Sequence, residues 1–336
     1  MAGRKVGKTP VEPVVWNPPA RPARAKRRTS EVPVNVEVIR IPGSGCEDVL
    51  IDADGSVLTG VSDGRILRIW PDGRAVFEVA DTGGRPLGLE FHPAGGLVVC
   101  DTERGLLRVS DDDWSVEVLV GDIDGVPMLF CNNCAVAADG TIYFTDSSTR
   151  FGIEEYKGDL LEHSSTGRLF RRDPDGTVTT LLSGLDFPNG VALAADESFL
   201  VFALTASYAV DRLWLTGERA GVTERFVENL PAFPDNVSLG SDGLFWVGLP
   251  STRNAVLDFL SPRAPVLRKL AWALPEVLQP HEARTIFAQA FDADGKLMHD
   301  LQQPHDELYM CTGVRERDGI VWLGSLACSA VGRVVL

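Results

Sequence analysis

A turn of the form Asp-Gly, preceded by an apolar strand and followed by a β-rich one, recurs along the whole chain. Each copy is typical of a β-hairpin, because Gly and Asp favour tight turns and alternating apolar residues favour half-buried strands. A third and a fourth strand follow most copies, at a repeat of about 40–50 residues. This pattern predicts an all-β fold, a six-bladed β-propeller in one domain over residues 34–336. The six turns centre on Gly55, Gly95, Gly140, Glu197, Gly243 and Gly319.

The ends of this domain are expected to close the ring. The strand at 34–41 is predicted to pair with the last strand, near 332–336, which removes the free sheet edges. Two spacings are long, because residues 147–165 and 261–290 add segments with partly helical patterns. We expect these insertions to form small helices and loops over one face, as a lid on a central pocket. A surface decoration or an oligomer contact is the alternative.

The charge is divided unevenly along the chain. The sequence has 32 Lys and Arg against 47 Asp and Glu, a net charge of −15. Residues 1–30 hold eight of the basic residues and one acid, so the rest of the chain carries −22. An acidic body repels phosphate, which argues against a nucleic-acid partner. Residues 1–33 are basic, rich in Pro and poor in apolar side chains, and are predicted to be a disordered tail. Electrostatic docking of this segment on an anionic surface, or on the acidic body itself, is the alternative.

Composition also limits the location of the protein. The six cysteines are too sparse for a disulfide scaffold in a chain of 336 residues. No apolar run of about 18 residues predicts a membrane span, and no apolar segment follows the basic N-terminus as in a secretory signal. We therefore expect a cytoplasmic protein with reduced thiols and a small-molecule substrate. The sequence leaves open whether it is a monomer or a dimer.

Polar residues precede the hairpin turns at a similar phase in four of the six units. The inner strands of a propeller begin around a shared axis, so these side chains are expected to converge. Carboxylate and carboxamide oxygens are the ligands that Ca²⁺ prefers. The alternative is that Asn and Asp only form turns ahead of the strands. The positions are Glu47, Asp48, Asn132, Asn133, Asn189, Asp235 and Asn236.

Long, ordered motifs carry a resemblance to a known family. The body resembles the strictosidine synthase-like family, in its adipocyte plasma-membrane-associated protein-like branch, within the gluconolactonase–paraoxonase superfamily. The resemblance covers about residues 36–336 and implies a six-bladed propeller, often with a catalytic Ca²⁺ in the central tunnel. The motifs that carry it lie at 85–89, 130–148, 184–193, 230–237 and 246–254.

Matched motif by motif, the resemblance implies a Ca²⁺ site made by Glu47, Asn132, Asn189, Asp235 and Asn236. In hydrolytic relatives the metal polarises a carbonyl or phosphoryl oxygen, and the residue at the place of Asp235 is a candidate base or nucleophile. Lewis-acid polarisation beside a carboxylate can drive the attack of water on an ester. The sequence therefore predicts a Ca²⁺-dependent hydrolase, with Asp235 as its catalytic residue, acting on a small, fairly apolar ester or lactone.

Three departures from the family pattern bear on the chemistry. Asn133 stands where an Asp is usual, and Leu87 stands where paraoxonases place a catalytic His. Thr312 stands where strictosidine synthases carry their catalytic Glu, so strictosidine synthase activity itself is not expected. Two alternatives stay open: a cyclase or condensing enzyme of specialised metabolism, or a binding propeller that Ca²⁺ only stabilises. The residues predicted to line the pocket are Cys46, Leu87, Cys131, Phe187, Phe233 and Thr312.

Overall fold

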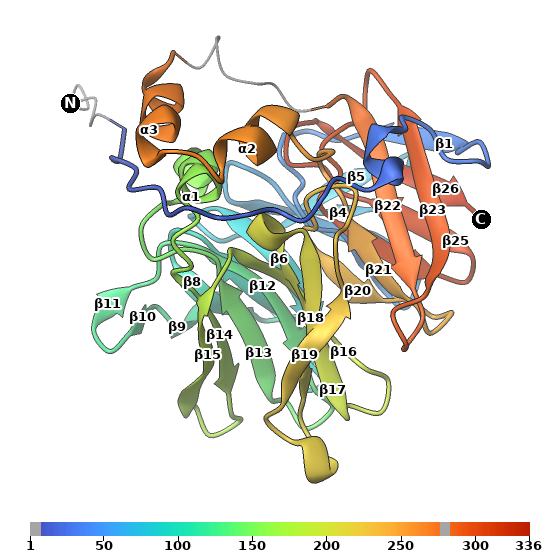
Figure 1. Cartoon of the computed structure of the whole chain (residues 1–336). Helices are drawn as coiled ribbons and strands as arrows, with labels where there is room; N and C mark the ends of the chain where they lie inside the picture. Colours follow the sequence, from blue (N-terminus) through green and yellow to red (C-terminus); the bar gives the residue numbers. More distant parts are fainter. Residues whose placement is uncertain (1–7, 276–282) are drawn as a thin grey trace, which may run out of the picture.

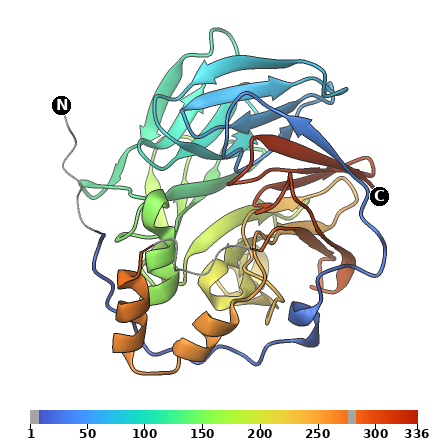
Figure 2. The same ribbon diagram turned by 90° about the horizontal axis from the view of Figure 1, so that it is seen from above.

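The computed structural model describes residues 8–275 and 283–336. Within these ranges, six four-stranded antiparallel sheets surround a central axis (Figures 1 and 2). The predicted six-bladed β-propeller is therefore confirmed. In every blade, the strands that are consecutive in the chain run from the axis outwards. The polar residues before each hairpin therefore lie at the centre of the ring.

The blades are numbered along the chain, and the strands of each run from the axis outwards. Blades one and two contain β2 (Leu50–Ile51), β3 (Val57–Gly60), β4 (Arg65–Ile69), β5 (Val76–Asp81), β6 (Pro86–Phe91), β7 (Leu97–Asp101), β8 (Gly105–Val109) and β9 (Val116–Val120). Blades three and four contain β12 (Cys131–Val136), β13 (Ile142–Asp146), β14 (Gly167–Arg172), β15 (Val178–Leu185), β16 (Pro188–Leu193), β17 (Phe199–Leu204), β18 (Ala209–Trp214) and β19 (Thr223–Val227). Blades five and six contain β20 (Val237–Leu239), β21 (Phe245–Gly248), β22 (Thr285–Phe291), β23 (Leu297–Pro304), β24 (Val314–Arg317), β25 (Ile320–Leu323), β26 (Ala330–Val335) and β1 (Val36–Arg40). A small ribbon outside the blades pairs β10 (Asp122–Ile123) with β11 (Val126–Pro127).

The ring closes as the sequence predicts. Strand β1 pairs antiparallel with β26, with Val36 opposite Val334 and Arg40 opposite Ala330. The sixth blade therefore combines the N-terminal strand with the last three strands of the chain. This pairing gives the sixth blade its fourth and outermost strand.

The six predicted turns all join the first and second strands of a blade, and each has a residue with positive φ. Gly tolerates this conformation without steric cost. In the fourth blade Glu197 takes the Gly position, at φ +55°. Its carboxylate accepts a hydrogen bond of 2.7 Å from the backbone N–H of Ala138, beside the corresponding turn of the third blade. A contact between blades thus accompanies the less favourable backbone conformation.

Inner strands approach one another so closely near the axis that two positions have no room for a side chain. A Cβ at Gly190 would lie 2.1 Å from the backbone nitrogen of Val237, and one at Gly88 would lie 2.6 Å from Cα of Asn133. Glycine at these positions lets neighbouring blades meet backbone to backbone. This close approach brings the polar residues of different blades within contact distance.

Both insertions form helices at one end of the ring, above the strands (Figure 1). The first gives α1 (Tyr156–Glu162), and the second gives α2 (Ala255–Leu260) and α3 (Pro265–Ala273). Residues 276–282 of the second insertion lie outside the described residues. Short 3₁₀ turns occur at η1 (Ala23–Lys26), η2 (Ile153–Glu155), η3 (Thr205–Ser207) and η4 (Gly217–Arg219). In the described part of the chain, no helix has the length and apolar character needed to cross a membrane.

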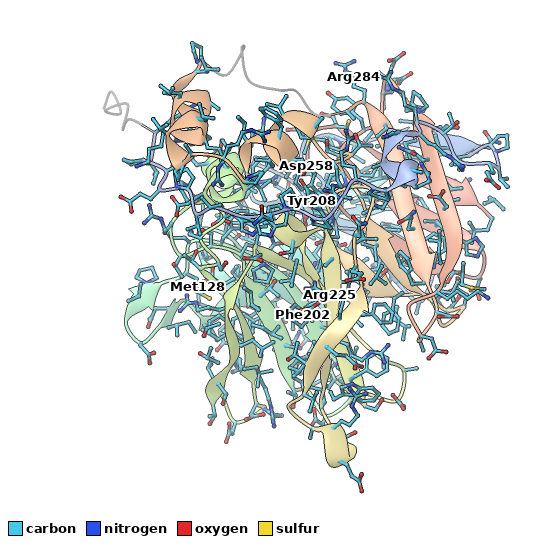
Figure 3. All side chains as sticks on the ribbon, viewed as in Figure 1. Met128, Phe202, Tyr208, Arg225, Asp258 and Arg284 are labelled. Atoms are coloured by element: carbon cyan, nitrogen blue, oxygen red, sulfur yellow. The ribbon has the colours of Figure 1, made fainter. Side chains whose placement is uncertain are left out.

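A buried polar cluster fixes α2 to the fourth blade. Tyr208 lies just below Asp258 of α2 (Figure 3) and donates a hydrogen bond from its hydroxyl to Oδ1 of Asp258 at 2.9 Å. Arg253 forms an ion pair with Asp258 at 3.1 Å, and its guanidinium lies 4.2 Å from the centre of the Tyr208 ring. The cluster therefore restricts the motion of α2, which forms one wall of the lid.

Residues 8–33 are not a disordered tail, and this part of the prediction was wrong. They cross the lid helices as an extended segment, which we call the strap (Figure 1). The backbone N–H groups of Glu12 and Val14 donate to the Oε2 and the backbone carbonyl of Glu162, at 2.7 and 2.8 Å. Arg268 donates to the carbonyl of Val14 at 2.6 Å. Composition did not predict this order, because the strap is held largely through its backbone groups. These groups form hydrogen bonds with buried residues of the lid.

Side chains of the strap add further anchors. The Trp16 ring stacks on His163 with ring centres 4.2 Å apart. Arg24 forms an ion pair with Asp300 at 2.5 Å and lies over the Phe287 ring, 4.8 Å from its centre. The strap therefore spans from the lid helices to the fifth blade.

Deleting residues 1–28 is expected to loosen the lid without unfolding the ring. Helices α1 and α3 would lose the hydrogen bonds from the strap, and local opening becomes easier when such bonds are lost. Amide hydrogen exchange in these helices should accelerate by roughly tenfold or more, while exchange in β13 stays unchanged. Mass spectrometry of exchange measures both regions at once. Equal exchange rates in α1 and α3 of the two proteins would show that the strap does not hold the lid.

Candidate metal centre and pocket

A cavity of about 190 Å³ lies between the lid helices and the central axis. Four of the five predicted metal ligands line it, namely Glu47, Asn132, Asn189 and Asp235. They come from the first, third, fourth and fifth blades, at or just before the inner strand of each. The structure thus brings together residues that are up to 188 positions apart in the chain.

Each of these four side chains has one buried oxygen without a hydrogen-bond partner among the described residues. The atoms are Oε2 of Glu47, Oδ1 of Asn132, Oδ1 of Asn189 and Oδ1 of Asp235. Leaving one buried acceptor unpaired costs about 1–3 kcal/mol, and more when it is charged. Four such acceptors lining one cavity indicate that the site is built to receive something that all four can contact.

Two hydroxyl groups orient the amides. Asn132 donates from Nδ2 to the hydroxyl of Ser147 at 2.8 Å, and Ser147 donates to the carbonyl of Pro188 at 2.7 Å. Asn189 donates from Nδ2 to Thr205 at 3.4 Å, and Thr205 donates to the carbonyl of Pro234 at 2.7 Å. Because each amide nitrogen is engaged, each amide oxygen is the atom left for a ligand. Ser147 and Thr205 were not predicted in this role, although each directly follows the second strand of its blade.

The fifth predicted ligand, Asn236, takes a different place. Its Nδ2 donates to Oε1 of Glu47 at 3.0 Å, and its Oδ1 accepts from Nδ2 of Asn133 at 3.1 Å. Asn133 in turn accepts from the backbone N–H of Val191 at 3.2 Å. In this arrangement Asn236 is absent from the cavity lining and positions Glu47. Its role as a direct metal ligand stays a prediction.

Each of the two carboxylates at the cavity base disfavours the charged form of the other. Burial, and next the charge of Asp235, raise the pKa of Glu47 well above its ordinary value. Burial raises the pKa of Asp235 to about 7. A cation between the two groups would remove this electrostatic penalty.

The donor set fits a hard cation. Within the described residues, no group of three His, Cys, Asp or Glu side chains is placed to hold a metal. A cation at this cavity would therefore need both carboxylates and both amide oxygens. Such an all-oxygen set, with positions left for water or substrate, is the kind that Ca²⁺ accepts.

A guanidinium occupies the tunnel next to the site. Arg315 forms ion pairs with Glu90 at 2.9 Å and Asp48 at 3.6 Å, and donates to the carbonyl of Leu89 at 3.0 Å. Asp48 also accepts from the backbone N–H groups of Leu89 and Val49, at 3.2 and 2.8 Å. Asp48 therefore neutralises a cation supplied by the chain itself and is not part of the candidate metal centre.

The predicted pocket residues divide into two groups. Leu87, Phe187, Phe233 and Thr312 line the cavity, as predicted. Cys46 and Cys131 do not line it, and their assignment to the pocket was wrong. They lie beside metal-ligand positions in the chain, but neighbouring side chains along a strand point to opposite sides.

Both cysteines instead pack between blades. The Cys46 thiol lies 3.0 Å from the carbonyl oxygen of Ala330 and belongs to the core beside the first blade. Cys131 packs with Cys100 and Cys134 between the second and third blades. All described cysteines are free and buried.

Most of the remaining cavity wall is apolar and comes from the lid and the strand ends. Phe130 and Phe187 meet edge to face with ring centres 5.2 Å apart. Phe187 and Met310 stand at positive φ, +54° and +50°, a conformation that costs free energy for residues other than Gly. A lid was expected from the sequence, but its pocket-facing residues were not identified, because a helix this short does not show which face it buries. These lid residues are Ile153, Tyr156, Lys157, Leu160, Leu161, Val256, Leu257, Leu260 and Ala271.

Asp159 gives the lid a dependence on pH. Burial raises the pKa of this carboxyl to about 7, well above the ordinary value of 3.8. Between these two pH values the folded protein binds more protons than the unfolded chain, so the contribution of Asp159 to stability falls as pH rises. The stability of Asp159→Asn relative to the wild type should therefore rise by about 2–3 kcal/mol from pH 5 to pH 8. Melting temperatures at both pH values measure this, and an equal difference at both would contradict it.

Comparison with known proteins places the chain in a family. Residues 132–218 match the family model of strictosidine synthase, and residues 34–69 match that of the strictosidine synthase-like N-terminal region. Strictosidine synthase-like protein 6 of Arabidopsis thaliana is 33% identical over 299 residues, covering 86% of this chain and 78% of that protein. The adipocyte plasma membrane-associated protein of Rattus norvegicus is 32% identical over 308 residues, covering 84% of this chain and 81% of that protein.

Solved structures show the same architecture. A gluconolactonase from Xanthomonas campestris matches with a TM-score of 0.67 at 18% identity, covering 98% of this chain and 95% of that one. The calcium-binding protein regucalcin from Agrobacterium tumefaciens matches with a TM-score of 0.63 at 11% identity, covering 90% and 94%. At these identities the likeness concerns the fold alone. The curated relatives decide the family, and the chain belongs to the strictosidine synthase-like family of six-bladed propellers.

Proposed function

We propose that this protein is a Ca²⁺-dependent hydrolase of a small, fairly apolar ester or lactone. The observation that carries the proposal is the set of four unpartnered oxygens, from Glu47, Asn132, Asn189 and Asp235, at an otherwise mainly apolar cavity. When bound, Ca²⁺ would act as a Lewis acid on the carbonyl oxygen of the substrate. The regucalcin and gluconolactonase structures support this proposal, since one is described as calcium-binding and the other as a gluconolactonase.

Different residues of the chain would bind the cation, accept the proton and exclude water. Glu47, Asn132 and Asn189 would hold the cation, each fixed by a neighbour that engages its other polar atom. Asp235 would both face the cation and accept a proton from the attacking water, since its carboxylate lines the same cavity. The ring of Phe187 and its neighbours would exclude bulk water from the reacting carbonyl.

The walls favour a substrate with an apolar acyl part. Leu87, Phe130 and Phe233 line the cavity, with Leu160 and Leu257 of the lid. A hydroxyl-rich sugar lactone would leave several polar groups unpaired against these side chains, at a cost for each. We therefore infer that alkyl or aryl groups are preferred.

A panel of aryl esters and of lactones with increasing chain length tests the proposal. We expect hydrolysis in Ca²⁺, its loss after treatment with a chelator, and its recovery when Ca²⁺ is restored. Activity that is indifferent to the chelator would contradict the metal's role. Product masses distinguish the alternative cyclase or condensing enzyme, since hydrolysis adds one water to the product. The cytoplasmic location expected from the sequence stays a prediction.

A further inference from the structure

The outer surface of α2 and α3 is unusually apolar for a surface exposed to water. Of the exposed residues in 255–275, only Arg263 and Lys269 are charged, and the others are Ala, Pro or large apolar residues. A contiguous apolar patch of this kind on a monomer marks an interaction site. Five large members, with their exposed fractions, are Val256 (55%), Phe259 (56%), Val266 (56%), Leu267 (38%) and Leu270 (62%). We call these five residues the apolar lid face.

The helices of this face have a second, inward surface. On α3, Val266 and Leu270 lie one turn apart on the outside, whereas Arg268 and Trp272 are buried. On α2, Phe259 points outward while Leu257 lines the cavity. The apolar residues on the inner surface of each helix are therefore accounted for by packing and by the cavity. Those of the apolar lid face have no such role and are exposed in the described structure.

The strap extends the apolar surface. Val14 and Val15 are 51% and 53% exposed, and Arg268 of α3 binds the carbonyl of Val14. Two regions distant in sequence, the strap and the segment that holds α2 and α3, thus present apolar side chains at one end of the molecule, where they lie together (Figures 1 and 2).

The charges of this face differ in sign from those of the rest of the protein. Residues 31–336 carry a large excess of acids, yet the exposed charged residues of 255–275 are both basic. The acid in this segment, Asp258, is held inward by its ion pair with Arg253. The Arg263 guanidinium lies 3.3 Å from the centre of the Phe259 ring, so a cation and an aromatic group stand side by side.

We propose that the apolar lid face docks on an anionic lipid surface. Apolar side chains from short helices can enter the boundary between headgroups and acyl chains. Arg263 and Lys269 would lie at the level of the anionic headgroups, where each basic residue strengthens binding roughly fivefold. A second copy of the chain explains the apolar residues but would bring Arg263 and Lys269 together with another basic pair, and it is the less favoured occupant.

The docking face is continuous with the pocket mouth. Val256 is exposed on the lid face and also lines the cavity. An apolar compound dissolved in the lipid could therefore pass into the cavity beside α2. Docking itself does not depend on the proposed hydrolase chemistry, and it is tested without an activity assay.

Flotation of the full-length protein with vesicles tests the proposal. We expect binding to vesicles of phosphatidylcholine mixed with phosphatidylserine, weaker binding to phosphatidylcholine alone, and release by salt. The double variant Phe259→Ser/Leu270→Ser should lower vesicle partitioning by about tenfold or more. The double variant Arg263→Gln/Lys269→Gln should lower it roughly tenfold on anionic vesicles and little on neutral ones.

Two controls keep the result specific. Phe77→Ser/Val118→Ser removes apolar side chains that are 52% and 44% exposed on β5 and β9, and it should leave partitioning unchanged. Sedimentation velocity of the wild type and of Phe259→Ser/Leu270→Ser detects a second copy on this face. Absence of vesicle binding, or a dimer that the lid-face variant dissociates, would overturn the proposal.

Discussion

Asp235→Asn should abolish the response of the protein to Ca²⁺. In the wild type, Ca²⁺ at about 100 times its dissociation constant contributes roughly 2.7 kcal/mol, or an increase of about 4 °C in melting temperature. The variant retains the shape of the side chain but loses one of the two charges that face the cation. Its melting temperature should not change with Ca²⁺, and any ester hydrolysis should fall about a thousandfold or more.

The same variant makes a second, opposite prediction for the metal-free protein. Without a cation, Asp235 is buried beside Glu47, and both carboxylates are disfavoured in their charged form. Removing one charge should leave the variant at least as stable as the wild type in chelator. Asp146→Asn is the matched control: Asp146 is fully buried, forms an ion pair with Arg168 at 2.6 Å, and is absent from the cavity lining. We expect this control to melt earlier but to keep its full increase with Ca²⁺; a lost increase there would undermine the assignment of Asp235.

Arg315→Met should be the most destabilising single change in the tunnel. The guanidinium balances Asp48 and Glu90, whose side chains are 2% and 22% exposed. Removing one partner of a buried charge network leaves uncompensated charge and costs about 3–5 kcal/mol. Urea unfolding, followed by tryptophan fluorescence, measures the loss.

Two further variants identify the cause of that loss. Arg317→Met changes an arginine of the same strand that is 41% exposed, removes its hydrogen bond to the carbonyl of Asp52, and should cost only about 1 kcal/mol. The triple variant Arg315→Met/Asp48→Asn/Glu90→Gln removes the unbalanced charges and should recover part of the lost stability. If the triple variant is no more stable than Arg315→Met, packing of the long side chain, and not its charge, determines the effect.

The fold was predictable because its signal repeats. Six similar turns, at Gly55 and its five counterparts, mark one hairpin in each blade. All six lie between the first two strands of a blade. The convergence of Glu47, Asn132, Asn189 and Asp235 followed from the same phase argument and from the family resemblance. Periodicity thus carries information between residues that are far apart in sequence.

The remainder depended on contacts that no local pattern reports. The strap looked disordered because its binding partners, such as Glu162 and Arg268, lie elsewhere in the chain. The assignment of Cys46 to the pocket failed because Cys46 precedes β2 and forms only an isolated bridge with Ser325, and outside a regular strand the sequence does not give the side to which a side chain points. The role of Arg315 was not predicted, because its partners Asp48 and Glu90 lie far away in the sequence and only the fold brings them together.

The pairing of β1 with β26 also has a consequence for how the protein is made. A ribosome delivers the N-terminal strand about 290 residues before the strand that it pairs with, so the sixth blade cannot form until synthesis is almost complete. Until then β1 has no partner, and the open arc of blades exposes sheet edges that can join other chains. Loss of the last few residues, including Val334 opposite Val36, should therefore affect the yield of soluble protein far more than the size of the truncation suggests.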